Sequence, residues 1–304
     1  MSILSTDYGK VVDLSERVAW RISDVVPPGA SLDFNRSFMP SAMFLGRELP
    51  FLDQREKLKL NQIYGASYAY LFYFVEAYII DMAMRHAQSE LYGDDDTLRA
   101  LLRFADEEVK HQQMFQRFRK LFERDFGSEC EVVPSPQAVA EVILSKSPMA
   151  VTLVTLHLEL ITQGHYVDCM RESEDMDPLF KSLFKHHWLE ESQHAKLDAL
   201  ELLRLRREAT AEQVQQTIDD YFAIAGAFAG LLAEQAKLDV VSLQRATGRS
   251  LEPAEVAELE KAQARSYHRA FLRSGVTNTL FLEFLAENFP GALEGAAKAA
   301  EAFA

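Results

Sequence analysis

Cysteine is scarce in this chain of 304 residues: Cys130 and Cys169 are the two present, far apart and without CxxC spacing. A disulfide framework and a cysteine-rich metal knot are therefore excluded, and we expect a reducing, cytoplasmic compartment. Basic residues are also in deficit, with 32 Lys and Arg against 46 Asp and Glu and a net charge of −14. This balance argues against a nucleic-acid partner, because phosphate recognition needs a basic surface.

Long apolar runs are missing as well. The most apolar stretch, 66–80, is too short to span a bilayer and contains Glu76, so we expect no membrane association. The opening residues MSILSTDYGK have neither the basic nor the apolar region of a signal peptide, and we expect no export.

Proline is rare enough to leave two long spans, 51–133 and 179–252, without a helix breaker. Asp53 followed by Glu56 is a capping box that predicts the start of a helix. Strand patterns are absent from the rest of the chain, and 48% hydrophobic residues can fill a sizeable core. The predicted helices lie at about 53–88, 97–126, 148–173, 178–207, 211–246, 252–273 and 280–288.

These elements predict one all-α domain over residues 1–304, with a bundle core at about 53–207 and additional C-terminal helices at about 211–288. Residues 32–40 are expected to form an irregular segment packed over the core. The alanine-rich end, 291–304, is expected to be a weak helix or a frayed tail.

Two Glu-x-x-His motifs, Glu108–His111 and Glu191–His194, carry the chemical signal. Spacing of three residues places both side chains of a motif on one helix face, so each pair can bind one metal ion. A single motif of this kind is more often a surface pair. The position of the two motifs in the chain therefore decides their meaning.

Two more glutamates, Glu76 and Glu159, lie in apolar segments where an unpaired carboxylate is costly. Each precedes its motif glutamate by 32 residues, and adding 83 converts Glu76, Glu108 and His111 into Glu159, Glu191 and His194. The midpoints of both separations fall in predicted loops, so each antiparallel hairpin brings its two glutamates to the same height. Two such hairpins packed as a four-helix bundle form a di-iron or di-manganese carboxylate site. Carboxylates bridge and neutralise two divalent ions, and imidazoles leave open positions for dioxygen.

His187 lies on the same helix face as Glu191 and His194, and its counterpart 83 residues earlier is Phe104. The repeat is therefore broken where a seventh ligand can enter. A buried structural histidine is the alternative interpretation of His187.

Other polar residues near the motifs have lesser roles. Glu107 and Glu190 are candidates for hydrogen bonds to the ligand histidines, or else solvated acids. His186 is expected at the surface, and His157 and His165 are expected to be structural.

Together these residues resemble the ligand pattern of the ferritin-like non-haem di-iron family, and the third histidine narrows the resemblance to the p-aminobenzoate N-oxygenase (AurF-like) group. The pattern covers about residues 76–194, and its metal ligands would be Glu76, Glu108, His111, Glu159, His187, Glu191 and His194.

The resemblance implies a ferritin-like four-helix bundle that holds two Fe ions. It implies that O2 is activated as a peroxo-diferric species, which N-oxygenates a small-molecule amine, taking an arylamine through the hydroxylamine to the nitro compound. It also implies an external electron donor, because no flavin or nicotinamide motif is present in the chain.

Several alternatives stay open at this point. The same ligands serve a Mn/Fe pair. The substrate can be aliphatic, with aldehyde deformylation, C–H hydroxylation or desaturation as the reaction. Iron storage and a non-catalytic, metal-stabilised binding protein are further possibilities. The helix at 211–246 either completes the fold or forms a homodimer face.

Overall fold

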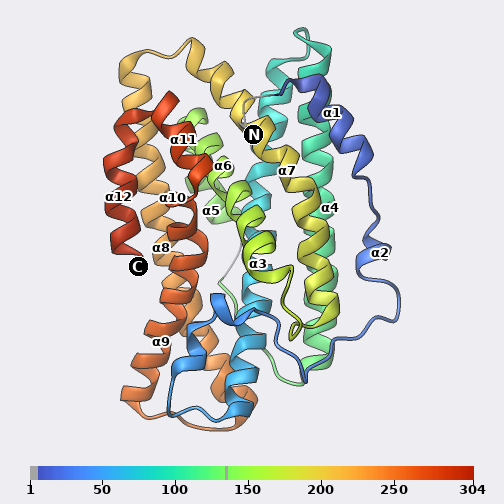
Figure 1. Ribbon diagram of the computed structural model, residues 1–304, viewed down its shortest axis with the longest axis vertical. Coiled ribbons are helices and arrows are strands. Elements are labelled where there is room, and N and C mark those ends of the chain that lie inside the picture. The colour runs from blue at the N-terminus through green and yellow to red at the C-terminus, as the bar shows by residue number, and fades with distance from the viewer. Residues whose placement is uncertain (1–5, 134–135) are drawn as a thin grey trace.

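The computed structural model describes residues 6–133 and 136–304, and this part of the chain is built from helices (Figure 1). Its one strand-like feature is a parallel bridge between Ser37 and Met176. The α-helices are α1 (Tyr8–Arg17), α2 (Ile22–Val25), α3 (Gln54–Ser89), α4 (Asp95–Phe126), α5 (Pro136–Leu144), α6 (Pro148–Gly164), α7 (Pro178–Arg207), α8 (Ala211–Thr247), α9 (Pro253–His268), α10 (Ser274–Val276), α11 (Thr279–Asn288) and α12 (Leu293–Ala302). The all-α prediction is confirmed.

The centre of the molecule is a four-helix bundle made of two hairpins, α3 with α4 and α6 with α7. Asp53 caps α3 in a complete capping box, as its sequence predicts. Gly127 ends α4 in the left-handed conformation, at φ 79°. Proline at the first position begins both helices of the second hairpin, α6 and α7. Local capping chemistry therefore sets the ends of the elements that build the centre.

The remaining helices cover the bundle on two sides (Figure 1). Helix α8 packs against α3 and α6, and α9 packs against α8. On the other side α1 lies against α4 and α7. The predicted irregular segment 32–40 packs on the core, where Phe38 and Met39 are fully buried. The chain end is helical, as α12.

Two helices of the prediction change their winding near their ends. The helix predicted to reach residue 173 continues beyond α6 as a π-helix, η3 (His165–Met170). The helix predicted over 252–273 likewise ends in a π-helix, η4 (Arg269–Arg273). Hydrophobic periodicity does not distinguish the two windings, because a π-turn adds one residue locally and is fixed by tertiary packing.

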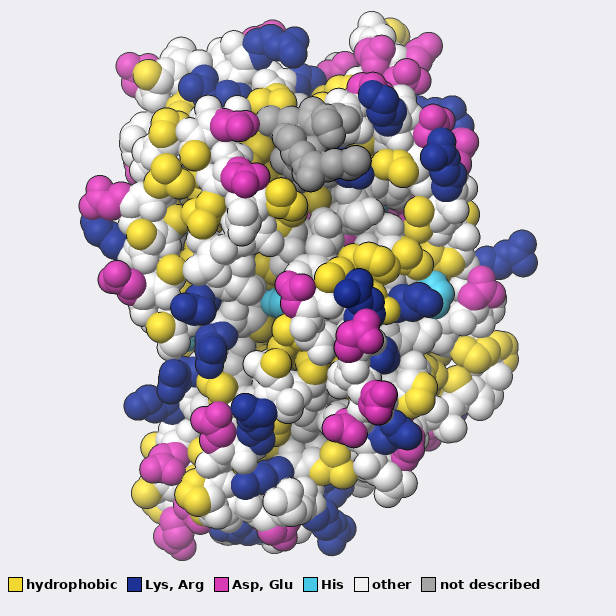
Figure 2. All heavy atoms as spheres, viewed as in Figure 1, with side chains coloured by type: hydrophobic (Ala, Val, Ile, Leu, Met, Phe, Trp, Pro, Cys, Tyr) yellow, Lys and Arg dark blue, Asp and Glu magenta, His cyan; other side chains and the backbone are white. Residues whose placement is uncertain are grey.

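Two broader features of the described chain bear on partners. None of its helices is both long and apolar enough to cross a membrane. On the face shown in Figure 2, Lys and Arg side chains are interspersed with Asp and Glu. That face therefore presents no continuous basic surface for a nucleic-acid backbone.

Candidate metal centre

The seven predicted ligands meet in the interior of the bundle. All of them are buried, with 3% or less of each residue exposed. Helix α3 supplies Glu76, α4 supplies Glu108 and His111, α6 supplies Glu159, and α7 supplies His187, Glu191 and His194. The sequence repeat therefore does bring side chains from four helices to one place.

Six of the seven residues fall into two overlapping groups. Potential ligand atoms of Glu108, His111, Glu191 and His194 all lie within 4.8 Å of one another. A second group, within the same limit, consists of Glu76, His111 and His187.

Glu159 belongs to neither group. Its Oε2 atom lies 4.0 Å from Nδ1 of His194, and its side chain lines the same small void as Glu76 and Glu191. His187 does lie inside the cluster, because its Nε2 is 3.1 Å from Glu76 Oε1 and 2.7 Å from Glu191 Oε1. The face assignment of His187 from the sequence is therefore correct.

The chemistry of the cluster fits a pair of divalent cations. Several of its polar atoms are buried without a hydrogen-bond partner among the described residues, and an orphaned buried polar atom is costly unless something binds it. These atoms are Glu76 Oε2, Glu108 Oε1 and Oε2, Glu159 Oε2, His111 Nδ1 and His194 Nδ1. Four carboxylates also balance the charge of two divalent ions, which offsets the cost of burying them.

Electrostatics inside the cluster point in the same direction. Burial raises the pKa of Glu76, and the neighbouring Glu108 carboxylate raises it further. Burial also raises the pKa of Glu191. Burial and nearby His111 lower the pKa of His187 well below its usual value. His187 is thus held as the neutral imidazole, the form that binds metals. Glu108 differs from the other two carboxylates, because hydrogen bonds from His111 and His194 outweigh burial and lower its pKa.

The two motif histidines are oriented by glutamates from the opposite hairpin. His111 Nε2 donates to Glu190 Oε2 at 2.8 Å, and His194 Nε2 donates to Glu107 Oε2 at 3.0 Å. With Nε2 protonated in each ring, the lone pair stands on Nδ1 and faces the cluster. The sequence expectation that Glu107 and Glu190 bond these histidines agrees with this geometry.

Two residues near the centre were missed by the sequence analysis. Ser15 on α1 donates its hydroxyl to Glu107, and the indole of Trp20 stacks on the His111 ring with centroids 5.9 Å apart. The Lys110 ammonium lies 4.2 Å from the centre of the Trp20 ring and also donates to Glu190. Neither Ser15 nor Trp20 belongs to a spaced motif, so nothing in the sequence marks them.

The other histidines that the sequence analysis assigned have partners outside the cluster. His157 bonds the hydroxyl of Tyr221 and the carbonyl of Phe271. His165 bonds Tyr68, and burial lowers the pKa of both histidines to about 4. His186 is half-buried rather than a free surface residue, because Trp20 packs against it.

The fold and this buried Glu/His cluster define a ferritin-like, di-iron, oxygen-dependent oxidoreductase. The model of the family "P-aminobenzoate N-oxygenase AurF" matches residues 50–276, and the chain belongs to that family. Membership confirms the family resemblance found in the sequence.

One similar solved structure is an R2-like ligand-binding oxidase mutant with an aerobically reconstituted Fe/Fe cofactor. It shares 13% identity with this chain, with 86% of this chain and 93% of that one covered and a TM-score of 0.47. The comparison with curated proteins found no match.

Proposed function

We propose that this di-iron oxygenase transfers oxygen to the nitrogen of an amine substrate, as its family's name describes. The proposed iron ligands are Glu76, Glu108, His111, Glu159, His187, Glu191 and His194. The observation that carries the proposal is the convergence of these buried side chains, with their unpaired atoms, in a chain that belongs to an N-oxygenase family.

The two iron ions, when bound, supply the redox chemistry that reduces dioxygen. The overall first step is amine + O2 + 2 H⁺ + 2 e⁻ → hydroxylamine + H2O, so one oxygen atom enters an N–O bond and the other leaves as water. The two electrons come from an external reductant, which we propose as a partner of this chain.

The protein's own contribution is to orient and enclose the centre. Glu107 and Glu190 keep the Nε2 protons of His194 and His111 in place, which fixes each ring and raises its basicity as a ligand. Phe72 and Phe115 each pack edge-on against His187, with ring centroids 5.1 Å apart. These rings exclude water from that side of the cluster.

A small apolar cavity lies beside the cluster. Its volume is about 30 Å³, and its lining includes Phe228, Phe271 and Ile224. Val75 and Leu158 line both this cavity and the small void at Glu76 and Glu191. The two spaces together are much smaller than a small-molecule site, so a substrate could reach the centre by this route only if the lining side chains moved apart.

The test begins with metal content. The full chain is loaded anaerobically with ferrous iron, loosely bound ions are removed, and iron is counted by elemental mass spectrometry. Oxygen uptake and ¹⁸O incorporation are then measured with panels of arylamines, alkylamines and aldehydes. We expect two irons per chain and labelled hydroxylamine or nitro products from an amine. Zero or one iron contradicts the proposed ligand set, and label in aldehyde or hydrocarbon products alone contradicts N-oxygenation.

A further inference from the structure

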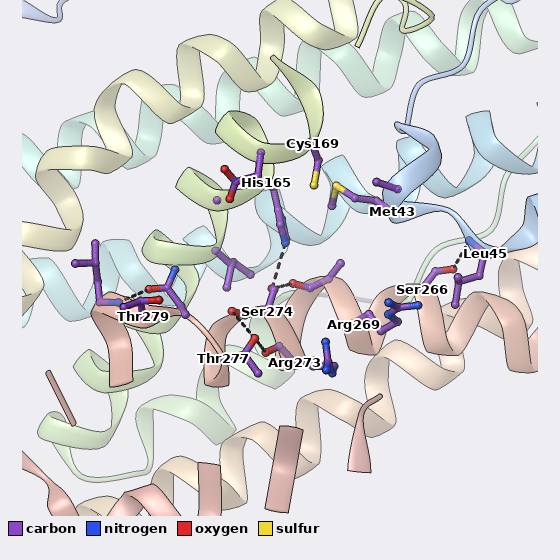
Figure 3. Close-up of a pocket in the computed structure, with 17 residues that line it drawn as sticks. Met43, Leu45, His165, Cys169, Ser266, Arg269, Arg273, Ser274, Thr277 and Thr279 are labelled. Atoms are coloured by element: carbon purple, nitrogen blue, oxygen red, sulfur yellow. Dashed lines mark hydrogen bonds between the residues drawn. The ribbon is translucent and has the colours of Figure 1, made fainter. Parts of the chain in front are cut away.

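A large pocket lies outside the metal centre, between the two π-helices. Its volume is about 500 Å³, within the range of small-molecule sites. Residues of η3, including His165 and Cys169, face residues of η4, including Arg269 and Arg273, across the opening (Figure 3). Met43 lies beside Cys169 in the lining (Figure 3). Both walls are thus π-turns, which occur frequently at functional sites.

The charges in this pocket do not cancel. Two arginines, Arg269 and Arg273, stand one helical turn apart on one wall, and Asp168 on the other wall is the acidic residue of the lining. His165 adds no charge at neutral pH, because burial lowers its pKa to about 4. The lining therefore carries a net charge of +1 in a chain whose total is −14.

Neither arginine is used by the protein for an ion pair within the described residues. Arg273 donates from Nε to the carbonyl of Ala300 at 3.3 Å, and this is its recorded side-chain hydrogen bond. Arg273 is half-buried and Arg269 is exposed, and two other half-buried arginines do form ion pairs. Arg204 pairs with Glu90 and Glu201, and Arg249 pairs with Glu56 and Glu255. The pocket thus holds two guanidinium groups that have no carboxylate partner among the described residues.

The N-terminus of another helix adds to the positive electrostatic potential in the pocket. Helix α11 begins at Thr279, which lines the pocket together with its cap, Asn278. The positive end of the α11 dipole therefore lies at the pocket, where it favours an anion. Apolar side chains of Met43, Leu45 and Ile161 complete the lining and can hold a hydrocarbon body.

We propose that this pocket is a second ligand site, which binds a small organic monoanion by pairing its carboxylate with Arg269 and Arg273. Guanidinium forks match a carboxylate with two parallel hydrogen bonds. A net charge of +1 favours a monoanion over a phosphate dianion. The site does not depend on the proposed N-oxygenation, because its residues are not among the proposed iron ligands.

The pocket lies behind the aromatic wall of the metal centre. Ser274 Oγ, whose proton goes to Ala270, accepts from His165 Nε2 at 3.2 Å, and His165 Nδ1 accepts from the Tyr68 hydroxyl at 2.6 Å. Tyr68 packs on Phe72, which in turn packs on His187. A ligand in the pocket is thus separated from the cluster by His165, Tyr68 and Phe72, and does not coordinate the metal.

The test is calorimetric titration of the iron-loaded full chain with cyclohexanecarboxylate and, as a neutral match of the same shape, cyclohexanecarboxamide. We expect saturable one-to-one binding of the acid and at least about tenfold weaker binding of the amide, the scale of one charge-assisted pairing. Arg273→Gln and Arg269→Gln should each weaken binding of the acid about tenfold. Arg265→Gln is the matched control, since it removes the same charge from α9, four residues before Arg269, at an exposed position that does not line the pocket.

Asp168→Asn is the variant that a folding defect cannot imitate, because it should strengthen binding of the acid about threefold or more by removing the opposing charge. Equal binding of acid and amide, equal losses in Arg265→Gln and Arg273→Gln, or no binding would overturn the proposal. Acid binding that is unchanged in Arg273→Gln would place the ligand on the metal instead. Tighter binding of inorganic phosphate than of the acid would refute the carboxylate assignment. None of these outcomes touches the iron count or ¹⁸O result that tests the proposed function.

Discussion

The two hairpins of the bundle hold their histidines in the same way but with different donors behind them. In each hairpin a glutamate just before the motif glutamate accepts from the opposite histidine, as Glu190 does for His111 and Glu107 for His194. The next layer also obeys the 83-residue repeat, because Lys110 donates to Glu190 while its counterpart Gln193 donates to Glu107. The repeat therefore extends beyond the predicted ligands to the groups that orient them.

The chemical difference lies in charge. Glu190 receives a direct hydrogen bond from an ammonium group, whereas the direct donors to Glu107 are neutral, the amide of Gln193 and the hydroxyl of Ser15, and its nearest cation, the Arg103 guanidinium, lies 3.9 Å away. A carboxylate whose cation is more distant withdraws less charge from its histidine partner and makes that imidazole a stronger donor. A second difference is the pair Phe104 and His187, which puts an extra imidazole in one half only. Two metal positions built by a repeat are thus made inequivalent by single substitutions.

Both hairpins contribute a motif glutamate to the cluster, and the largest effect is expected when one of these is removed, in Glu108→Ala or its repeat counterpart Glu191→Ala. Both carboxylates lie in the four-residue group, so each loss should leave at most one iron per chain and abolish oxygen uptake. Elemental mass spectrometry after anaerobic loading measures the effect. Glu123→Ala, at an exposed position on α4, is the control and should keep two irons. Full iron content in either variant would refute the ligand assignment.

The charge difference is tested by Glu190→Gln against Glu107→Gln. In Glu190, one carboxylate oxygen accepts from His111 and the other accepts from Lys110. A glutamine at this position replaces one of these oxygens with an NH2 group. That NH2 group then faces the N–H of either His111 or Lys110, and neither of them can accept a hydrogen bond from it. At 107 the Ser15 hydroxyl can turn and accept from the new amide. Loss of an orienting carboxylate typically weakens metal binding about tenfold to a hundredfold.

We therefore expect the upper end of that range for Glu190→Gln and the lower end for Glu107→Gln. Chelator competition gives the iron affinity of each variant. The reverse order would show that the ammonium group of Lys110 does not distinguish the halves.

Features set by neighbouring residues in the chain were predictable from the sequence, whereas most contacts between distant residues were not. Helix ends set by local chemistry, such as the Asp53 cap and the Gly127 stop, were predicted to within a residue or two. The convergence of six residues was predicted because a repeat offset reports a long-range relation within one chain, and His187 was predicted because its spacing places it on the helix face of Glu191 and His194. Ser15 and Trp20 were not found, since one hydroxyl and one indole bear no periodic relation to the residues they meet. The π-turns at His165 and Arg269 were missed for a similar reason, because packing rather than composition selects them.

The asymmetric histidine is tested by His187→Phe, which gives the second hairpin the residue that the first has at 104. Phe72, Phe115 and Phe184 already surround His187, so a phenyl ring should fit without unfolding. We expect two irons to remain, because six proposed ligands are intact, and product formation to fall about tenfold or more, the scale of a lost catalytic electrostatic contact. Far-UV circular dichroism and iron content control for the fold. Unchanged turnover would show that the third imidazole has no part in the reaction.

The smallest expected effect comes from Ser15→Ala, which sharpens the comparison without touching a proposed ligand. The variant removes one buried hydroxyl that donates to Glu107, while Gln193 still donates to the same carboxylate. A hydrogen bond to an ionised carboxylate contributes about 1.5–3 kcal/mol, and only part of this reaches the metal through His194, so iron should dissociate about fivefold faster from the position of His194. The rate is followed by trapping released iron with a chromogenic chelator.

Ser145→Ala is the control, because the exposed Ser145 hydroxyl donates to the carbonyl of Val142, far from the cluster in sequence. The rate of iron release from this variant should match that of the unmodified chain. A biphasic trace in Ser15→Ala, with one accelerated phase and one unchanged, is the signature of two inequivalent positions, whereas equal acceleration of both phases would mean that α1 stabilises the bundle as a whole.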